Sequence, residues 1–355
     1  MGLSAHAAAD SGPLERLEGA LARYERIAEA GGWPAVPEGP TIEPGTLDPR
    51  VEVVARRLAI SGDLENASRE FDTYDEELQL AVRRFQARHG LEQDARIGTQ
   101  TLHALNVSAA QRVEQLRRNI ERSRQIFGTP RNDFLLVNIP AFTVTLFREG
   151  KERSTTRVVV GNDETQTPLF EAQLKSVVLN PTWTVPRTIA SEELLPKIQA
   201  DIGYLARNDY DVVDTDGRRV DPANVQWGEL HKNNFPYTLV QRPGPLNELG
   251  RIKFLFPNDY GVCMHDTPKK FLFARDSRAF SHGCVRVEDP VNFAAHLLGP
   301  EGWSLERIVA QLDTRETRTI ALANPLPVVL VYLTAAADDN GTVYFYRDIY
   351  GMDAG

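Results

Sequence analysis

The period of the hydrophobic pattern changes near residue 133, and this change constrains the fold more than any other feature of the sequence. Before it, apolar residues recur at the spacing of a helix, as Leu78, Ala81, Val82 and Phe85 do. After it, the segments FLLVNIP and FTVTLF alternate with a period close to two, which is typical of β-strands. A length of 355 residues exceeds that of most single domains. We therefore expect a multidomain α+β protein, helical first and mainly β afterwards.

The first 107 residues are predicted to contain an N-terminal arm and a small helical domain. A helix from Gly12 to Ala30 and a Gly- and Pro-rich run make residues 1–46 a helix with a linker or arm. Residues 47–107 are predicted to form a three-helix domain, in which Asp48 caps the first helix and Pro49 occupies its first turn.

The two following helices of this domain have clear ends. The second is predicted to stop at His89-Gly90, and the third to run from about Thr99 to Leu105. A capping box of Ser108 and Gln111 then opens a longer connecting helix within residues 108–130.

Residues 131–355 are predicted to form the mainly-β domain. One strand is expected to place Phe142, Val144 and Leu146 on a single face. Residues 188–247 break the β pattern with a helical run, ASEELLPKIQA, and an acidic, aromatic stretch. We interpret them as an inserted, helix-containing capping subdomain, because long excursions of this kind often act as lids.

Composition excludes several functional classes. The formal net charge of −9 argues against a protein that coats nucleic acid. Two cysteines are too few for a disulfide framework or a four-cysteine zinc site. No run reaches the ~18 apolar residues of a membrane span, and PVVLVYL is predicted to be a buried strand. Met1-Gly2 is compatible with a start after a removed export signal.

The stretch AFSHGCVRVEDP, residues 279–290, is the strongest chemical signal. A cysteine attacks as a thiolate, and its ordinary pKa of about 8.5 requires a base or positive charge nearby. His282 is a poor candidate because it sits two residues from Cys284, whereas His265 ends an apolar strand nineteen residues upstream. The Gly283 amide, with those of its two neighbours, is a candidate oxyanion hole. The alternative is that Cys284 is a small buried hydrophobe and the histidines are core residues.

The whole string resembles the signature of the L,D-transpeptidases. In that family a histidine is followed, after fewer than twenty residues, by Ser/Thr-His-Gly-Cys, one residue and arginine. The matching positions are His265, Ser281, His282, Gly283, Cys284 and Arg286.

A second resemblance concerns residues 47–107. The segment YDEELQLAVRRFQARHGLEQDARIGTQTLHALN is similar to the peptidoglycan-binding domain of bacterial wall enzymes. Its matching features are AV-x-x-FQ, HGL, an acidic turn, IG-x-x-T and ALN. Ala95 is a departure, since that family usually has glycine there. The resemblance implies binding to peptidoglycan glycan, or a scaffold if the altered turn weakens binding.

Further segments resemble the long-form, lidded L,D-transpeptidases of Gram-negative bacteria. They include NPTWTVPRTIASEELLPKI, GYLARNDYDVVD, PGPLNELGRIKFLFPN and the closing DIYG, so the resemblance runs from about residue 30 to the end. Cys263 is a departure, because this subgroup often has tyrosine two residues before the histidine. Alternation would place Cys263 on the same strand face as His265, and we expect it to have a packing role.

The family resemblance implies a definite reaction. Cys284 would attack the amide between the diamino acid and the terminal D-Ala of a stem tetrapeptide, form a thioester and release D-alanine. The side-chain amine of a second stem would accept the acyl group, giving a 3→3 cross-link. His265 would take the thiol proton and return it to the leaving amine. No metal or other cofactor is expected.

The remaining site residues have two interpretations each. In a functional role, Arg286 favours the thiolate or binds a substrate carboxylate. In a structural role, it braces the loop through Glu288 or Asp289, and we prefer this structural role. Trp183 either lines the donor groove or packs in a core. The chain is expected to be a periplasmic monomer that acts on stem peptides and glycan, not nucleic acid, and that carbapenem β-lactams acylate.

Two other functions fit the same residues. In a peptidoglycan carboxypeptidase or endopeptidase, water would capture the same thioester, and the outcome would depend on how well the lid excludes water. A non-catalytic wall-binding protein would use residues 47–107 alone, although the intact cysteine, histidine and glycine argue against it.

Overall fold

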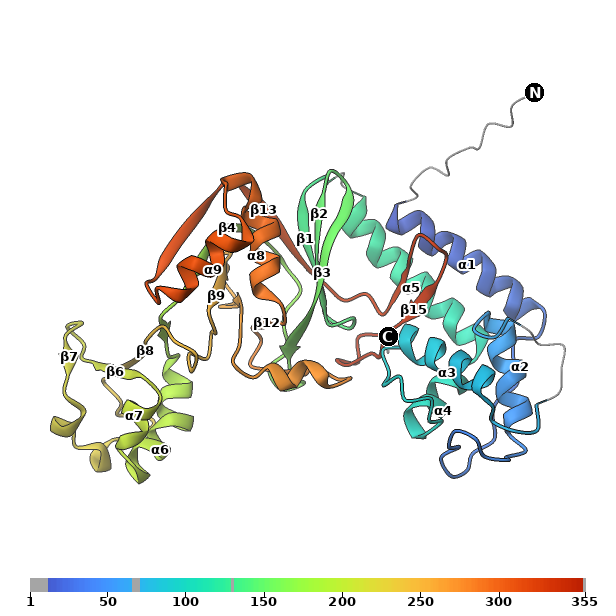
Figure 1. The fold of residues 1–355 in the computed structure, drawn as a ribbon, viewed down its shortest axis with the longest axis horizontal. Helices are drawn as coiled ribbons and strands as arrows, with labels where there is room; N and C mark the ends of the chain where they lie inside the picture. The colour runs from blue at the N-terminus through green and yellow to red at the C-terminus, as the bar shows by residue number, and fades with distance from the viewer. Residues whose placement is uncertain (1–11, 66–70, 129–130, 354–355) are drawn as a thin grey trace. The chain divides into compact units, whose positions relative to one another are not determined.

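The computed structural model describes residues 12–65, 71–128 and 131–353. It contains two compact units (Figure 1). The first comprises residues 1–131, 138–141 and 332–355, and the second residues 132–137 and 142–331. Met1, Gly2 and residues 129–130 of the predicted connecting segment lie outside the described residues.

The described part of the first unit is built mainly from helices. They are α1 (Pro13–Glu29), α2 (Val51–Ser61), α3 (Glu76–Arg88), α4 (Thr99–Asn106) and α5 (Ala109–Phe127). The predicted capping box is confirmed, because the Ser108 hydroxyl accepts a hydrogen bond from the Gln111 amide and the Gln111 side chain accepts one from the Ser108 amide. Helix α3 also ends as predicted: His89 is its C-cap, and Gly90 follows with φ +63°.

The predicted start of α2 is wrong by two residues. The helix begins at Val51, and its N-cap is Arg50 rather than Asp48. The Asp48 carboxylate instead accepts hydrogen bonds from the Arg50 backbone amide at 2.9 Å and from its guanidinium at 2.7 Å. The side-chain pairing with arginine therefore competes with the capping role that the sequence pattern predicts.

The end of the chain belongs to the first unit, so the predicted extension of the β domain to residue 355 is wrong. Strands β14 (Ala335–Ala337) and β15 (Val343–Phe345) form a hairpin. It packs on α1 and α5, which run side by side (Figure 1). The Phe345 ring lies 5.3 Å from that of Tyr24 in α1, in a core that also contains Leu17, Leu116 and Val343. Burial of this apolar surface holds the two ends of the sequence together.

In the described residues of the second unit, nine strands form one sheet in the order β11-β3-β12-β10-β9-β4-β13-β1-β2. An additional pairing of β2 with β3 closes the sheet on itself. The bounds are β1 (Phe134–Asn138), β2 (Thr143–Arg148), β3 (Lys151–Gly161), β4 (Glu171–Leu179), β9 (Ile252–Leu255), β10 (Met264–His265), β11 (Ala279–Ser281), β12 (Val285–Val287) and β13 (Arg318–Val331). The PVVLVYL run lies largely in β13, as predicted.

Short helices cover part of this sheet. They are α8 (Pro290–Leu298), α9 (Leu305–Asp313) and the 3-10 turns η4 (Lys270–Ala274) and η5 (Gly299–Glu301). The predicted strand face that starts at Phe142 is wrong in one position. Phe142 has φ +55° and precedes β2, while Val144 and Leu146 are buried in it.

The 188–247 insertion contains both helices and strands. A π-helical turn η1 (Ile189–Leu194) leads into α6 (Leu195–Ala200) and α7 (Gly203–Arg207), followed by η2 (Pro222–Asn224) and η3 (Trp227–Glu229). A separate sheet joins the strands of the insertion to β5 (Trp183–Thr184), which precedes residue 188. Its order is β5-β8-β6-β7, with bounds β6 (Tyr210–Val213), β7 (Arg219–Val220) and β8 (Thr238–Gln241). The insertion has its own apolar core, which includes Leu195, Ile198, Tyr210, Phe235 and Leu239. The sequence pattern did not predict this second sheet.

Candidate active site

The register of two parallel strands brings the cysteines together. Strand β10 pairs with β12, with Met264 opposite Val285 and His265 opposite Arg286. Cys263 and Cys284 each stand one residue before these pairs, so they are neighbours across the two strands. The Val285 amide donates to the Cys263 carbonyl at 2.8 Å, and the Cys263 amide donates to Cys284 Sγ at 3.3 Å.

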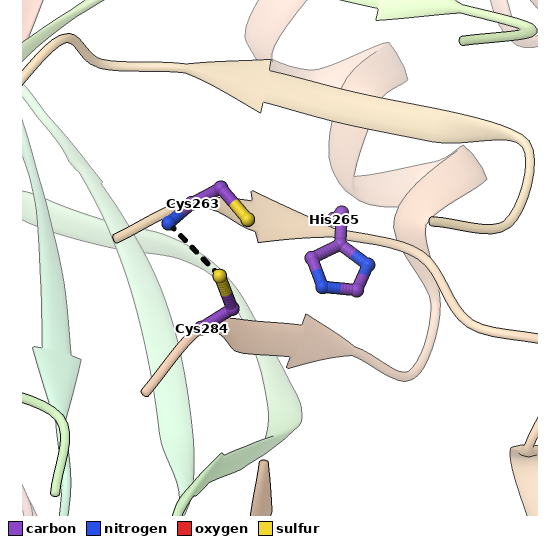
Figure 2. Close-up of side chains that lie close together, drawn as sticks. All are labelled: Cys263, His265 and Cys284. Atoms are coloured by element: carbon purple, nitrogen blue, oxygen red, sulfur yellow. Dashed lines mark hydrogen bonds between the residues drawn. The ribbon is translucent and has the colours of Figure 1, made fainter. Parts of the chain in front are cut away.

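The side chains of Cys263, His265 and Cys284 converge (Figure 2). The two sulfurs and one ring nitrogen of His265 all lie within 4.8 Å of one another. Both thiols are half-buried, while the His265 side chain is almost fully buried, with 5% of its surface exposed. The structure therefore places the predicted nucleophile beside the predicted base.

A backbone hydrogen bond orients the imidazole of His265. Its Nδ1 bonds to the Asp266 carbonyl oxygen, which can only accept, so Nδ1 carries the proton. Nε2 is then left free to take a proton from a neighbouring group. This is the tautomer that a general base beside Cys284 requires.

The surroundings of Cys284 stabilise its thiolate. A hydrogen bond from the Cys263 thiol lowers the pKa of Cys284 most, to about 4, against the opposing effect of burial. His265 lowers the pKa of Cys284 further through a hydrogen bond and its charge, and the Cys263 amide does so through a hydrogen bond. The same hydrogen bond to Cys284, together with burial, raises the pKa of the Cys263 thiol well above its ordinary value. The two sulfurs thus differ: Cys284 is the anion and Cys263 the proton donor.

The turn before Cys284 depends on glycine and serine. Gly283 has φ +100°, a backbone conformation that residues with a side chain rarely adopt. The Ser281 hydroxyl donates to the Cys284 carbonyl at 2.5 Å and accepts from the Gly283 amide at 3.1 Å. Because the Gly283 amide is engaged, the amides of His282 and Cys284 are the remaining donors for the predicted oxyanion hole.

The capping insertion reaches this turn. Glu193 Oε1, in η1, lies 3.5 Å from His282 Nε2, two residues from Cys284. His282 is exposed, which agrees with its rejection as the base and leaves it facing the insertion. The insertion therefore stands next to the site, as a lid must.

Arg286 does not brace the loop through the predicted carboxylates. Glu288 pairs with Arg157, and Asp289 caps α8 by accepting from the Asn292 amide at 3.3 Å. Within the described residues Nε of Arg286 is buried without a hydrogen-bond partner. Burial lowers the pKa of Arg286, and Glu248 and the thiols oppose that effect. Its charge therefore lies where it favours the Cys284 thiolate.

Trp183 lies in β5, just before the insertion, and packs against the core of the insertion. It is half-buried against the apolar core of the insertion, and its ring lies 6.4 Å from that of Tyr210. The core interpretation of Trp183 predicts this packing, and the groove interpretation stays a prediction.

Two supporting residues escaped the sequence analysis. Buried Asp266 accepts hydrogen bonds from the Arg251 and Thr267 amides and from Lys270 Nζ, at 2.7–2.8 Å. It also fills the space beside Gly250, where a Cβ would lie 2.3 Å from its carboxylate. Its position directly after His265 was an available signal. Thr167 donates to the Gly283 carbonyl at 2.9 Å, and no local pattern marks it.

Two protein families match parts of the chain. The L,D-transpeptidase catalytic domain family matches residues 132–320, and a provisional peptidoglycan-binding domain family matches residues 48–105. A Haemophilus influenzae protein, provisionally named an L,D-transpeptidase, is 38% identical over 219 residues, which are 62% of this chain and 44% of that protein. The chain thus spans less than half the length of this relative.

Two solved L,D-transpeptidase structures match the chain at low sequence identity. The L,D-transpeptidase from Stackebrandtia nassauensis is 14% identical, with a TM-score of 0.30, over 83% of this chain and 97% of the other. The ertapenem-acylated catalytic domain of the E. faecium enzyme is 12% identical, with a TM-score of 0.27, over 57% of this chain and all of the other. No helix among the described residues is long and apolar enough to cross a membrane. Since the catalytic-domain family covers more than half of the sequence, the chain belongs to the L,D-transpeptidase family.

Proposed function

We propose that the protein is a peptidoglycan L,D-transpeptidase of the periplasm, with Cys284 as nucleophile and His265 as general acid and base. The observation that carries the proposal is the convergence of Cys284, His265 and Cys263 within 4.8 Å. The pKa of about 4 for Cys284 supplies the thiolate that acyl transfer needs.

In the first step, the Cys284 sulfur bonds to the carbonyl carbon of the diamino acid, and the bond to the nitrogen of D-Ala breaks. His265 delivers the proton that it took from the thiol to this nitrogen, so D-alanine leaves as a neutral amine. The amides of His282 and Cys284 are the candidate donors to the developing oxyanion. Arg286 stabilises the thiolate that the second step regenerates.

In the second step, the side-chain amine of another stem attacks the thioester. The new amide forms as the carbon–sulfur bond breaks, and the amine proton passes to His265. The thioester keeps the acyl group reactive, so no external energy source is needed. Placement of Glu193 beside His282 supports transfer over hydrolysis, because a lid at the site limits access of water.

Residues 48–105, which match the peptidoglycan-binding family, are proposed to hold the enzyme on the glycan. Membership of the long-form, lidded Gram-negative subgroup is proposed on the 188–247 insertion. Carbapenem acylation is proposed on the E. faecium relative, which is described as acylated by ertapenem.

Product analysis tests the reaction. Purified disaccharide-tetrapeptide is incubated with the full chain, and the products are measured by mass spectrometry. Transfer predicts a dimer of two stems that has lost one D-alanine, and Cys284→Ala should produce none. Tripeptide without dimer would establish the hydrolase alternative, and unchanged tetrapeptide would contradict both enzymatic functions.

A further inference from the structure

Cys263 has no bond-making part in the proposed reaction, yet its sulfur completes a compact set of metal-ligating atoms. The two sulfurs and one ring nitrogen of His265 lie within 4.8 Å of one another (Figure 2). Cys263 and Cys284 directly precede β10 and β12, and His265 lies in β10, so the parallel pairing of the two strands fixes the spacing of the three residues. The backbone bonds between Cys263 and the Cys284–Val285 segment hold the two cysteines in place.

The chemistry of these ligands suits zinc. Two thiolates and one imidazole form a donor set that favours Zn²⁺ over Mg²⁺ or Ca²⁺, which prefer oxygen. Two thiolate charges also balance the charge of the ion. Around tetrahedral zinc, ligand atoms lie roughly 3.3–3.8 Å apart, so a cluster that spans 4.8 Å at most needs to close by about 1 Å.

The surroundings of His265 match those of a metal-binding histidine. Such residues usually donate their second ring N–H to a carboxylate or backbone carbonyl, which directs the other nitrogen at the metal. His265 makes this bond from Nδ1 to the Asp266 carbonyl. Asp266 is itself fixed by the Arg251 and Thr267 amides, so the orientation of the ring is held by buried backbone contacts.

We propose that Cys263, His265 and Cys284 form a three-ligand Zn²⁺ site with a fourth position open to water. Binding forms two Zn–S bonds and one Zn–N bond and releases the protons of the two thiols to solvent. No oxidant or reductant takes part. Metal binding follows from the ligands alone; its consequence, reversible inhibition by occupation of the nucleophile and base, rests on the proposed function.

Metal binding to the full chain tests the site. The protein is reduced with a phosphine, desalted and titrated with Zn²⁺ against a chromogenic chelator, and bound metal is counted by elemental analysis. We expect one zinc per chain and, with Co²⁺ as probe, a sulfur-to-cobalt charge-transfer band. Cys263→Ser should weaken zinc binding by at least tenfold and diminish that band, while His103→Ala, an exposed histidine of the first unit, should change neither.

Thermal unfolding in the absence of metal shows whether Cys263→Ser is folded, and Cys263→Ala provides a second variant. Equal zinc affinity in the wild type and both variants would overturn the proposal. So would a loss of both free thiols without bound metal, because that result means a disulfide. Zinc should also slow carbapenem acylation of the wild type more than of Cys263→Ser. If the protein binds zinc but carbapenems do not acylate it even when it is free of metal, the metal site stands and the proposed function is refuted.

Discussion

At the scale of single residues, the state of the Cys284 sulfur decides the pH dependence of the reaction. Its pKa is lowered to about 4, so the thiolate is present above that pH and is lost as the pH falls through it. We therefore expect the rate constant of carbapenem acylation to be level between about pH 8 and about pH 6 and to fall near pH 4. Stopped-flow acylation measures it. A tenfold fall per pH unit starting near pH 8 would indicate an ordinary thiol.

Cys263 tunes this pKa, because its thiol makes the hydrogen bond that lowers the pKa of Cys284 most. Cys263→Ala should keep the covalent adduct, since Cys284 is intact, but the acid limb of the acylation profile should move to higher pH. The same pH series measures the shift. An unmoved limb would show that His265 and the backbone suffice to stabilise the thiolate.

The proximity of Cys284 and His265 could be predicted because the motif resemblance and the apolar strand that ends at His265 both lie in a short stretch of sequence. The sequence did not predict the hydrogen bond between the cysteines. That contact depends on the register of β10 against β12, two strands that local patterns cannot pair. The Arg286 brace failed for a similar reason, since Arg157 from β3 competes for Glu288.

At the scale of elements, a buried ion pair joins the helices of the first unit. The Arg88 guanidinium in α3 donates to both carboxylate oxygens of Asp63, at 2.6 and 2.5 Å. Both side chains are over nine-tenths buried, and Arg57, which is also buried, lies close enough for its charge to interact with theirs. Asp63 thus balances charge that would otherwise be costly to bury.

Asp63→Ala should lower the free energy of unfolding by about 3–5 kcal/mol, because it leaves buried guanidinium charge without its carboxylate. Urea unfolding measures this change. The exposed Asp72→Ala is the matched control and should change stability by less than about 0.5 kcal/mol. Equal stability of the two variants would mean that Arg88 finds another partner.

Helix caps and strand alternation could be predicted because their signals lie within a few residues of one another. The sheet of the insertion could not, since its strands β5 and β8 come from segments more than fifty residues apart. Phe142 shows the limit of alternation, because its left-handed backbone removes it from the strand that its hydrophobicity predicts.

At the scale of the whole molecule, the C-terminal hairpin belongs to the unit that contains α1 and α5. Phe345 is 2% exposed, and its ring is close to those of Tyr24 and His89. The sequence pattern predicts the hairpin in the β domain, because contacts between segments far apart in the chain leave no local pattern. The division of the chain into two units becomes visible in the core that the hairpin shares with α1 and α5.

Phe345→Ala should therefore destabilise the first unit by about 3–5 kcal/mol, the usual cost of emptying a buried aromatic site. Calorimetry should show that the unfolding transition of the first unit moves to lower temperature. Carbapenem acylation, which depends on the second unit, should persist at temperatures where the first unit has already unfolded. Phe271→Ala, at a 66% exposed position of the second unit, serves as control. Loss of acylation in step with the shifted transition would contradict the division into two units.

We assign nucleophilic chemistry to Cys284, one of two adjacent sulfurs. Intact-mass measurement after carbapenem treatment of the full chain distinguishes the two. We expect one adduct on the wild type, none on Cys284→Ala, an adduct on Cys263→Ala, and formation slowed by roughly 10²–10⁴ in His265→Ala. An adduct that survives Cys284→Ala, or that disappears only with Cys263→Ala, would mean that Cys284 is not the nucleophile.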